Sequence, residues 1–208
     1  MTSLSIDCIP EAITRSIIFS NGGVLMMADL AGAQAVDELD GEAFSVRCDG
    51  KRNEWSVFDG TEGRGGNPRR AFTTAHASHV QWRIFSAPAL VASVAQSCGL
   101  GVAPTGGGTY TYYERPGDFL ALHLDVLTCD LTVITCLRDT GKDEGALVVY
   151  PQHSLTRARE AGRCAGRPVA VRRGESAVLL GGFIPHEVTP MGPEQERIVS
   201  VMCYRVAL

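Results

Sequence analysis

The stretch 112–125, YYERPGDFLALHLD, decides what this sequence predicts about fold and chemistry. It ends in His123, Leu124 and Asp125. Alternate residues of a β-strand point to the same side, so His123 and Asp125 can converge on one ion while Leu124 points away. His186 follows 61 positions after Asp125, inside another strand-like run. The three polar side chains are therefore candidate ligands of one metal ion.

Two histidines and one carboxylate, with the remaining positions open, form the facial triad of non-haem iron(II) sites. An H-x-D tripeptide also arises by chance in any strand with a partly exposed polar face. The pattern therefore needs support from the rest of the chain.

The composition describes an ordinary globular chain. It has 208 residues, 45% of them hydrophobic and 20% charged, and β-sandwiches and barrels of this length are common as single units. The net charge of −4 argues against a protein that binds nucleic acid by broad phosphate neutralisation. No apolar run approaches the roughly 20 residues needed to cross a bilayer, and the N-terminus shows no secretory signal. We expect neither nucleic acid nor a membrane as a partner.

The cysteines indicate a reducing environment. They are odd in number and include no C-x-x-C pair, at positions 8, 48, 98, 129, 136, 164 and 203. This pattern predicts reduced, mostly buried thiols in a cytoplasmic protein. Cys136 and Cys203 lie in strand-like runs, where they are most simply small buried hydrophobic residues.

The first half of the chain reads as mixed structure. Residues 13–27 are rich in β-formers, with a turn at Asn21-Gly22-Gly23. The segment 29–39 has the spacing of an amphipathic helix. The segment 88–98 is a second helix, with Pro near its start and Gly99 after its end. Between these helices, 60–68 has the composition of a loop.

From position 110 onward, short β-rich runs follow one another between Gly, Pro and Asp residues. The expected strands are 110–113, 119–126, 131–138, 146–150, 168–172, 176–180, 186–189 and 197–206. Many short strands with turn signals predict a sandwich or barrel. The predicted fold is mainly β with flanking helices, a double-stranded β-helix or cupin-like jelly roll. We expect one domain, 1–208, in which 1–104 supports a jelly-roll core at 105–208.

Residues 105–206 resemble the Fe(II)/2-oxoglutarate-dependent oxygenases. The stretch 112–125 is similar to the approach to the metal strand in prolyl-hydroxylase-type members. The segment 145–154, GALVVYPQHS, and the strand 174–180, GESAVLL, are similar to phytanoyl-CoA-hydroxylase-like members. The resemblance implies Fe(II) held by His123, Asp125 and His186, with 2-oxoglutarate and O₂ as co-substrates. An open site fits this chemistry, because the keto acid needs two metal positions and O₂ a third.

The resemblance also implies two contacts to 2-oxoglutarate. Tyr113 lies ten residues before His123, and Arg197 lies 11 residues after His186. The arginine would pair with the far carboxylate, because burying that charge unpaired is costly and a guanidinium answers it with two hydrogen bonds. Many relatives have Ser two residues after this arginine, but here that position is Val199.

Substrate residues are less clearly marked. The segment 64–70, RGGNPRR, combines flexibility with Arg64, Arg69 and Arg70. One interpretation is a lid whose arginines receive an acidic group of the substrate, and the other is an exposed turn with solvated arginines. His76 and His79 could mimic a metal pair, but no carboxylate is placed to help them.

The predicted activity is oxidation of a small molecule, such as an amino acid or a biosynthetic intermediate, with release of succinate and CO₂. The resemblance favours hydroxylation over halogenation. In the halogenating branch of this superfamily a small residue replaces the carboxylate ligand, whereas this chain has Asp125 at that position. The alternatives are a peptidyl hydroxylase of the same superfamily and a non-catalytic, cupin-like protein that binds a metal or a small ligand.

Overall fold

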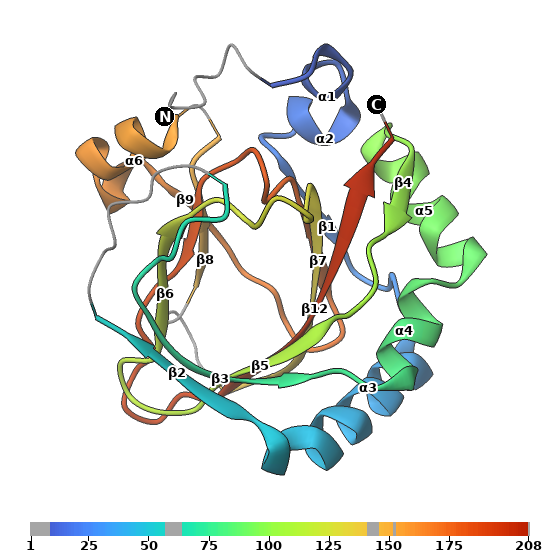
Figure 1. Ribbon diagram of the computed structural model, residues 1–208, viewed down its shortest axis with the longest axis vertical. Coiled ribbons are helices and arrows are strands. Elements are labelled where there is room, and N and C mark those ends of the chain that lie inside the picture. Colours follow the sequence, from blue (N-terminus) through green and yellow to red (C-terminus); the bar gives the residue numbers. More distant parts are fainter. Residues whose placement is uncertain (1–8, 57–63, 141–145, 152, 208) are drawn as a thin grey trace.

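The computed structural model describes residues 9–56, 64–140, 146–151 and 153–207. The strands in these ranges form one sheet of 12 strands, in the order β1-β10-β7-β12-β5-β3-β6-β11-β8-β9, with β2 beside β3 and β4 beside β12. Neighbouring strands run antiparallel, and the sheet curls into a barrel-like shell (Figure 1). The predicted jelly-roll fold, mainly β with flanking helices, is confirmed.

The strands are β1 (Val24–Met27), β2 (Lys51–Trp55), β3 (Arg70–His76), β4 (Val102–Pro104), β5 (Thr109–Tyr113), β6 (Phe119–His123), β7 (Leu131–Asp139), β8 (Leu147–Val149), β9 (Arg167–Val169), β10 (Ser176–Leu179), β11 (His186–Val188) and β12 (Arg197–Val206). The helices are α1 (Glu11–Thr14), α2 (Ile17–Ser20), α3 (Ala33–Val46), α4 (His79–Phe85), α5 (Pro88–Cys98) and α6 (Leu155–Ala161), with 3-10 turns η2 (Arg47–Asp49) and η3 (Arg163–Ala165).

Strand β12 shows how the sequence assigns two faces to the barrel wall. Val199 and Val201 belong to an apolar cluster that includes Phe72. Their neighbours Met202 and Tyr204 belong to the larger cluster that includes the helices. Because alternate residues of a strand point to opposite sides, one set lines the barrel interior and the other receives the helices.

Helices α3, α4 and α5 cover the outside of the barrel on the β12, β5 and β3 side (Figure 1). Three buried tyrosine hydroxyls tie the sheet to these helices. Tyr110 donates to the Glu42 carboxylate at 2.7 Å, Tyr112 to the Ala43 carbonyl at 2.7 Å, and Tyr204 to the Phe85 carbonyl at 2.6 Å. These bonds satisfy hydroxyls that burial would otherwise leave without partners.

Most expected elements are present, with shifted ends. Helix α5 has the predicted bounds, and the helix expected at 29–39 is α3, which starts later and runs further. The β-rich interpretation of 13–27 was wrong for its first part, because α1 and α2 precede β1. The Ser16 hydroxyl accepts a hydrogen bond from the Phe19 amide and so caps α2.

The first half of the chain contributes more to the barrel than its sequence indicated. One edge of strand β3 pairs with β5 through 73–76 and with β6 through 70–71, and both of these strands belong to the second half. Strand β2 adds to its other side. Both strands carry many polar residues, so the hydrophobic pattern did not reveal them. Residues 60–63 of the expected loop, and 145 and 152 of the 145–154 segment, lie outside the described residues.

The expectation of reduced thiols was wrong for two cysteines. Cys129 and Cys203 form a disulfide, with Cα atoms 5.0 Å apart and 74 positions between them in sequence. The pairing of β7 with β12 brings them together, and no local pattern could reveal this. Cys98 and Cys136 are free and buried, whereas Cys48 and Cys164 are free and exposed. The cysteine pattern therefore no longer supports a cytoplasmic location.

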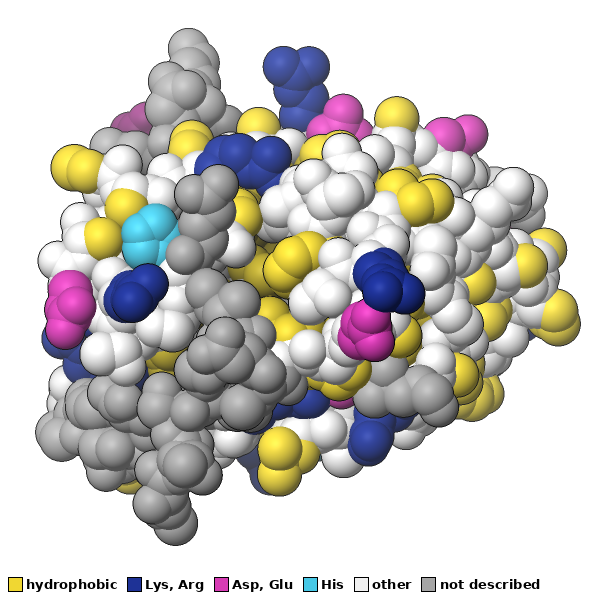
Figure 2. Space-filling model, turned by 90° about the horizontal axis from the view of Figure 1, so that it is seen from above, with side chains coloured by type: hydrophobic (Ala, Val, Ile, Leu, Met, Phe, Trp, Pro, Cys, Tyr) yellow, Lys and Arg dark blue, Asp and Glu magenta, His cyan; other side chains and the backbone are white. Residues whose placement is uncertain are grey.

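No helix in the described ranges has the length and apolar character required to cross a membrane. On the face seen in Figure 2, basic side chains are scattered singly around apolar ones. The described residues of that face therefore form no continuous basic patch.

Glu42 offers a test of how the helices are held. Its two carboxylate oxygens accept the backbone amides of Val80 and Gln81, at the start of α4, as well as the Tyr110 hydroxyl. Replacing Glu42 by Ala removes the acceptor of two buried donors and one half-buried donor, and we expect the free energy of unfolding to fall by about 3 kcal/mol in denaturant titrations. On the same helix, the half-buried Glu38 pairs with the exposed Arg83, and Glu38→Ala should cost less than about 1 kcal/mol. Equal losses would contradict this role of Glu42.

Candidate metal centre

His123 and His186 face each other across neighbouring strands. They are direct cross-strand partners of β6 and β11, and their ring centroids lie 4.2 Å apart. The Nδ1 of His123 is 2.9 Å from the Ala121 carbonyl oxygen, and that of His186 is 3.0 Å from the Ile184 carbonyl oxygen. Each carbonyl is two residues upstream and accepts the Nδ1 proton, which leaves both Nε2 lone pairs free for a metal.

Asp125 completes the cluster from just beyond the end of β6. Its backbone amide donates to the Gly181 carbonyl at 2.8 Å. Its Oδ1 lies 3.5 Å from the Nε2 of His123 and 3.6 Å from that of His186. The possible ligand atoms of the three residues all lie within 4.8 Å of one another. Residues separated by 61 positions are thus brought together as predicted.

His123 and Asp125 have the protonation states that metal binding needs, whereas the raised pKa of His186 favours a proton that a metal ion would displace. Burial and the charge of His186 lower the pKa of His123, so its imidazole is neutral. Burial raises the pKa of Asp125, but the two histidines outweigh this and hold it well below its usual range. Burial lowers the pKa of His186, but Asp125 outweighs this and raises it. A metal ion at this site would bind the ionised carboxylate and take the place of the proton on His186.

The donor set fits iron(II). Two imidazole nitrogens and one carboxylate oxygen converge, and no fourth His, Cys, Asp or Glu of the described ranges joins them. A centre with three protein ligands on one side keeps other positions for exchangeable ligands.

Tyr113 and Arg197 lie together on the barrel wall. They are direct cross-strand partners of β5 and β12, and each is only 4% exposed. Tyr113 packs with Phe72, with ring centroids 5.5 Å apart, in the interior cluster that also contains Val199. Burial raises the pKa of Tyr113 and Arg197 lowers it in part, so the phenol stays protonated and can donate.

The departure from the usual serine is visible in the structure. Val199 lies in the interior cluster, whereas the Ser200 hydroxyl accepts from Gln81 at 2.8 Å on the helix-covered side. Ser200 therefore cannot replace the missing interior hydroxyl.

The Arg64 side chain is largely buried and does not project from an exposed loop, as the lid interpretation required. Its side chain is 10% exposed, its Nη1 is 2.9 Å from Asp130, and its Nη2 donates to the carbonyls of Val126, Leu127 and Cys129. These carbonyls belong to the loop 125–130, which begins at the candidate metal ligand Asp125 and which we call the metal loop. The structure thus places the Arg64 guanidinium inside the protein, against the metal loop.

Arg69 and Arg70 point to opposite sides of the barrel wall. Arg69 lines an outer groove of about 670 Å³ together with Phe119 and Ala121. Arg70 is the cross-strand partner of Leu120, which packs against the interior cluster, and directly opposed residues share a face. Arg70 donates to Asn67.

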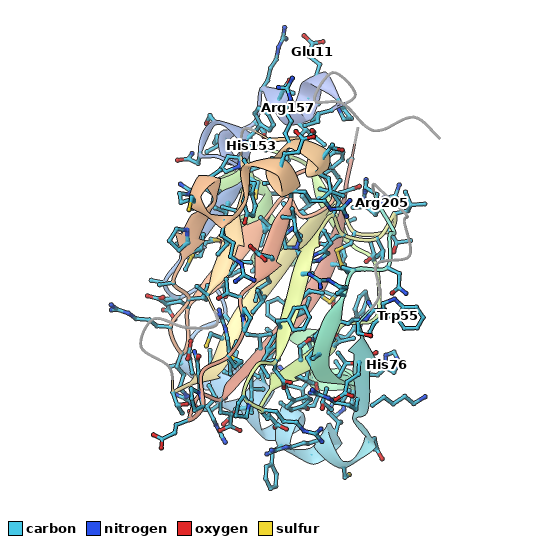
Figure 3. All side chains as sticks on the ribbon, turned by 90° about the vertical axis from the view of Figure 1, so that its left-hand side faces the viewer. Glu11, Trp55, His76, His153, Arg157 and Arg205 are labelled. Carbon is cyan, nitrogen blue, oxygen red and sulfur yellow. A yellow bond between two sulfur atoms is a disulfide. The ribbon has the colours of Figure 1, made fainter. Side chains whose placement is uncertain are left out.

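The other three histidines lie apart from this cluster. His76 ends β3, His79 begins α4, and both are exposed. His153 lies just before α6, far from His76 in Figure 3.

Two supporting residues were missed from the sequence. The Thr132 hydroxyl donates to Oδ2 of Asp125, and Gly181 lies directly beside the same oxygen. The adjacent glycines 181 and 182 shortly before His186 were the available signal, because such glycines permit close backbone approach. Nothing in the sequence marks Thr132.

Comparison with known proteins places the fold. No protein-family model matches the sequence, and no curated protein matches it. Among solved structures, a prolyl-4-hydroxylase from Pseudomonas putida is 19% identical with a TM-score of 0.63, over 94% of this chain and 99% of the other. The chain has the fold of the 2-oxoglutarate–iron(II) oxygenases.

Two further structures share this fold. The epimerase SnoN, in complex with Fe3+, alpha-ketoglutarate and nogalamycin RO, is 15% identical with a TM-score of 0.68, over 94% of this chain and 84% of the other. HygX from Streptomyces hygroscopicus, with nickel and 2-oxoglutarate bound, is 15% identical with a TM-score of 0.61, over 95% and 87% of the two chains. At these identities the likeness establishes the fold alone.

Substitution of Arg64 tests whether its guanidinium stabilises the metal loop. Arg64→Ala removes the guanidinium that donates to the loop carbonyls and leaves Asp130 with Arg205 and the Val206 amide. Removing one partner of a buried pair costs about 3 kcal/mol, so we expect that loss in denaturant unfolding. Amide hydrogen exchange in 125–130 should also become faster. Arg157→Ala, at an exposed site on α6 labelled in Figure 3, is the control and should change neither quantity. Unaltered exchange in Arg64→Ala would refute the role.

Proposed function

We propose that this protein is an Fe(II)- and 2-oxoglutarate-dependent oxygenase. One observation carries the proposal: an open His–Asp–His cluster shares a barrel with a buried arginine–tyrosine pair. A metal-binding protein without turnover needs the first feature but not the second. The shared fold with enzymes of this kind supports the proposal.

Each residue has a role in the proposed reaction. His123, Asp125 and His186 hold Fe(II). Arg197 pairs with the far carboxylate of 2-oxoglutarate, because a buried carboxylate needs a charged partner. Tyr113 stays protonated and donates a hydrogen bond to the same co-substrate. The iron supplies the O₂ chemistry in which 2-oxoglutarate becomes succinate and CO₂ while a C–H bond of the second substrate is oxidised.

The first test is binding of the co-substrate. Under anaerobic conditions, Fe(II) and 2-oxoglutarate should give the weak visible charge-transfer band of the chelate. Arg197→Ala should weaken 2-oxoglutarate binding at least tenfold, which corresponds to about 1.4 kcal/mol, while metal binding is retained. The control is Arg138→Ala, because Arg138 is opposite Ile198 on the neighbouring strand and pairs with Asp40 and Glu196.

The outcomes separate two classes of protein. A band in the wild type that disappears in Arg197→Ala supports the oxygenase. Wild-type protein with bound iron but no band would refute it and favour a cupin-like binding protein. Equal affinity for 2-oxoglutarate in both proteins would refute Arg197 as the anchor.

We further propose that the second substrate is a small molecule with an acidic group, received by Arg70. Of the three arginines in 64–70, Arg70 occupies the strand position that faces the interior, opposite Leu120. The complex of SnoN with nogalamycin RO supports a small molecule as the second substrate, because it shows that this fold accommodates one.

Arg70 has a matched control in its neighbour. Small organic acids are screened for stimulated succinate release, and Arg70→Ala should raise KM for the stimulating acid at least tenfold without changing 2-oxoglutarate binding. Arg69→Ala should leave both values unchanged, because Arg69 faces the outer groove. Equal effects of the two substitutions would contradict this role, as would stimulation by prolyl peptides alone, which would indicate a peptidyl hydroxylase.

A further inference from the structure

We propose that Thr132 and Gly181 orient the Asp125 carboxylate so that only its Oδ1 reaches the metal. Thr132 is then a positioning residue, and Gly181 provides the space for the second oxygen. This inference rests on the proposed metal centre and concerns the residues beneath it.

Thr132 holds the oxygen that faces away from the histidines. It is the second residue of β7 and is 4% exposed. Its Oγ1 donates to Oδ2 of Asp125, while Oδ1 remains 3.5 and 3.6 Å from the two Nε2 atoms. A hydrogen bond to a charged acceptor is stronger than one between neutral groups, so it resists rotation of the carboxylate.

The disulfide beside Thr132 competes only weakly with Asp125 for the hydroxyl proton of Thr132. The Sγ of Cys129 lies 3.2 Å from Oγ1 of Thr132. Because this sulfur is bonded to Cys203, it carries no proton and can offer Thr132 only a weak acceptor. The carboxylate is the better acceptor, so the hydroxyl donates to it.

Gly181 closes the other side of the carboxylate. A Cβ built at Gly181 would overlap Oδ2 of Asp125 and lie 3.1 Å from Oγ1 of Thr132. The carbonyl of the same glycine accepts the Asp125 amide at 2.8 Å. Gly181 therefore fixes the backbone of the ligand and leaves room for its outer oxygen, a combination that requires the absence of a side chain.

The number of Asp125 oxygens that bind the metal determines how many of its coordination positions stay open. A carboxylate that binds through one oxygen takes one position, and one that binds through both takes two. With two histidines, one-oxygen binding leaves three of six octahedral positions, which the keto-acid chelate and O₂ together require. Holding Oδ2 on the protein side thus keeps the third position free.

The experiment uses Co(II) as a spectroscopic probe, without 2-oxoglutarate. Thr132→Val should weaken Co(II) binding about tenfold. At saturating Co(II) it should also change the visible spectrum to that of a higher coordination number, as the freed carboxylate binds through both oxygens. Thr132→Ser keeps the hydroxyl and should restore the wild-type spectrum. Thr135→Val is the matched control, because Thr135 is also buried on β7 but bonds Ser176 instead.

The readouts separate positioning from stability. A spectrum changed in Thr132→Val but wild-type in Thr132→Ser and Thr135→Val supports the proposal, as does loss of Co(II) binding by folded Gly181→Ala. A wild-type spectrum in saturated Thr132→Val would overturn it, and so would unaltered Co(II) binding by Gly181→Ala. Because no 2-oxoglutarate is present, failure of the oxygenase proposal shows separately, as a wild type that binds Co(II) but not the co-substrate.

Discussion

The register between β6 and β11 is the constraint on which the rest of the site depends. It sets His123 directly opposite His186, and a slip of one residue would turn a ring to the other side of the barrel wall. The Ala121 carbonyl, on β6 itself, holds the ring of His123, and the Ile184 carbonyl, in the turn before β11, holds the ring of His186. Strand pairing and ring orientation are therefore set together.

Burial of charged side chains at the site has a free-energy cost that their partners must offset. Asp125 remains ionised in the interior because the two histidines offset the cost of removing its charge from water, and the Thr132 hydroxyl donates a hydrogen bond to it. Arg64 and Asp130 repeat this logic beneath the metal loop, where a buried guanidinium pairs with a carboxylate and three carbonyls. Arg64 and Asp130 thus hold the metal loop through a buried ion pair and hydrogen bonds, which limits the positions that the loop can adopt.

The second half of the barrel could be predicted because its strands are apolar, short and separated by turn residues. Strands β2 and β3 could not, because they are polar and their partners come later in the chain. The same reason hid the Cys129–Cys203 disulfide, whose members are 74 positions apart. Arg64, Arg69 and Arg70 looked alike in sequence, yet one supports the metal loop, one lines an outer groove and one faces the interior.

The sequence by itself determined the ligand types, the strand period and the offsets of Tyr113 and Arg197, because these depend on local spacing. Only the tertiary structure decided that the cluster closes, that Tyr113 and Arg197 are cross-strand partners, and that Thr132 and Gly181 hold one oxygen of Asp125. Those contacts join strands distant in the chain, and their geometry is set by sheet register and burial, which no local pattern records.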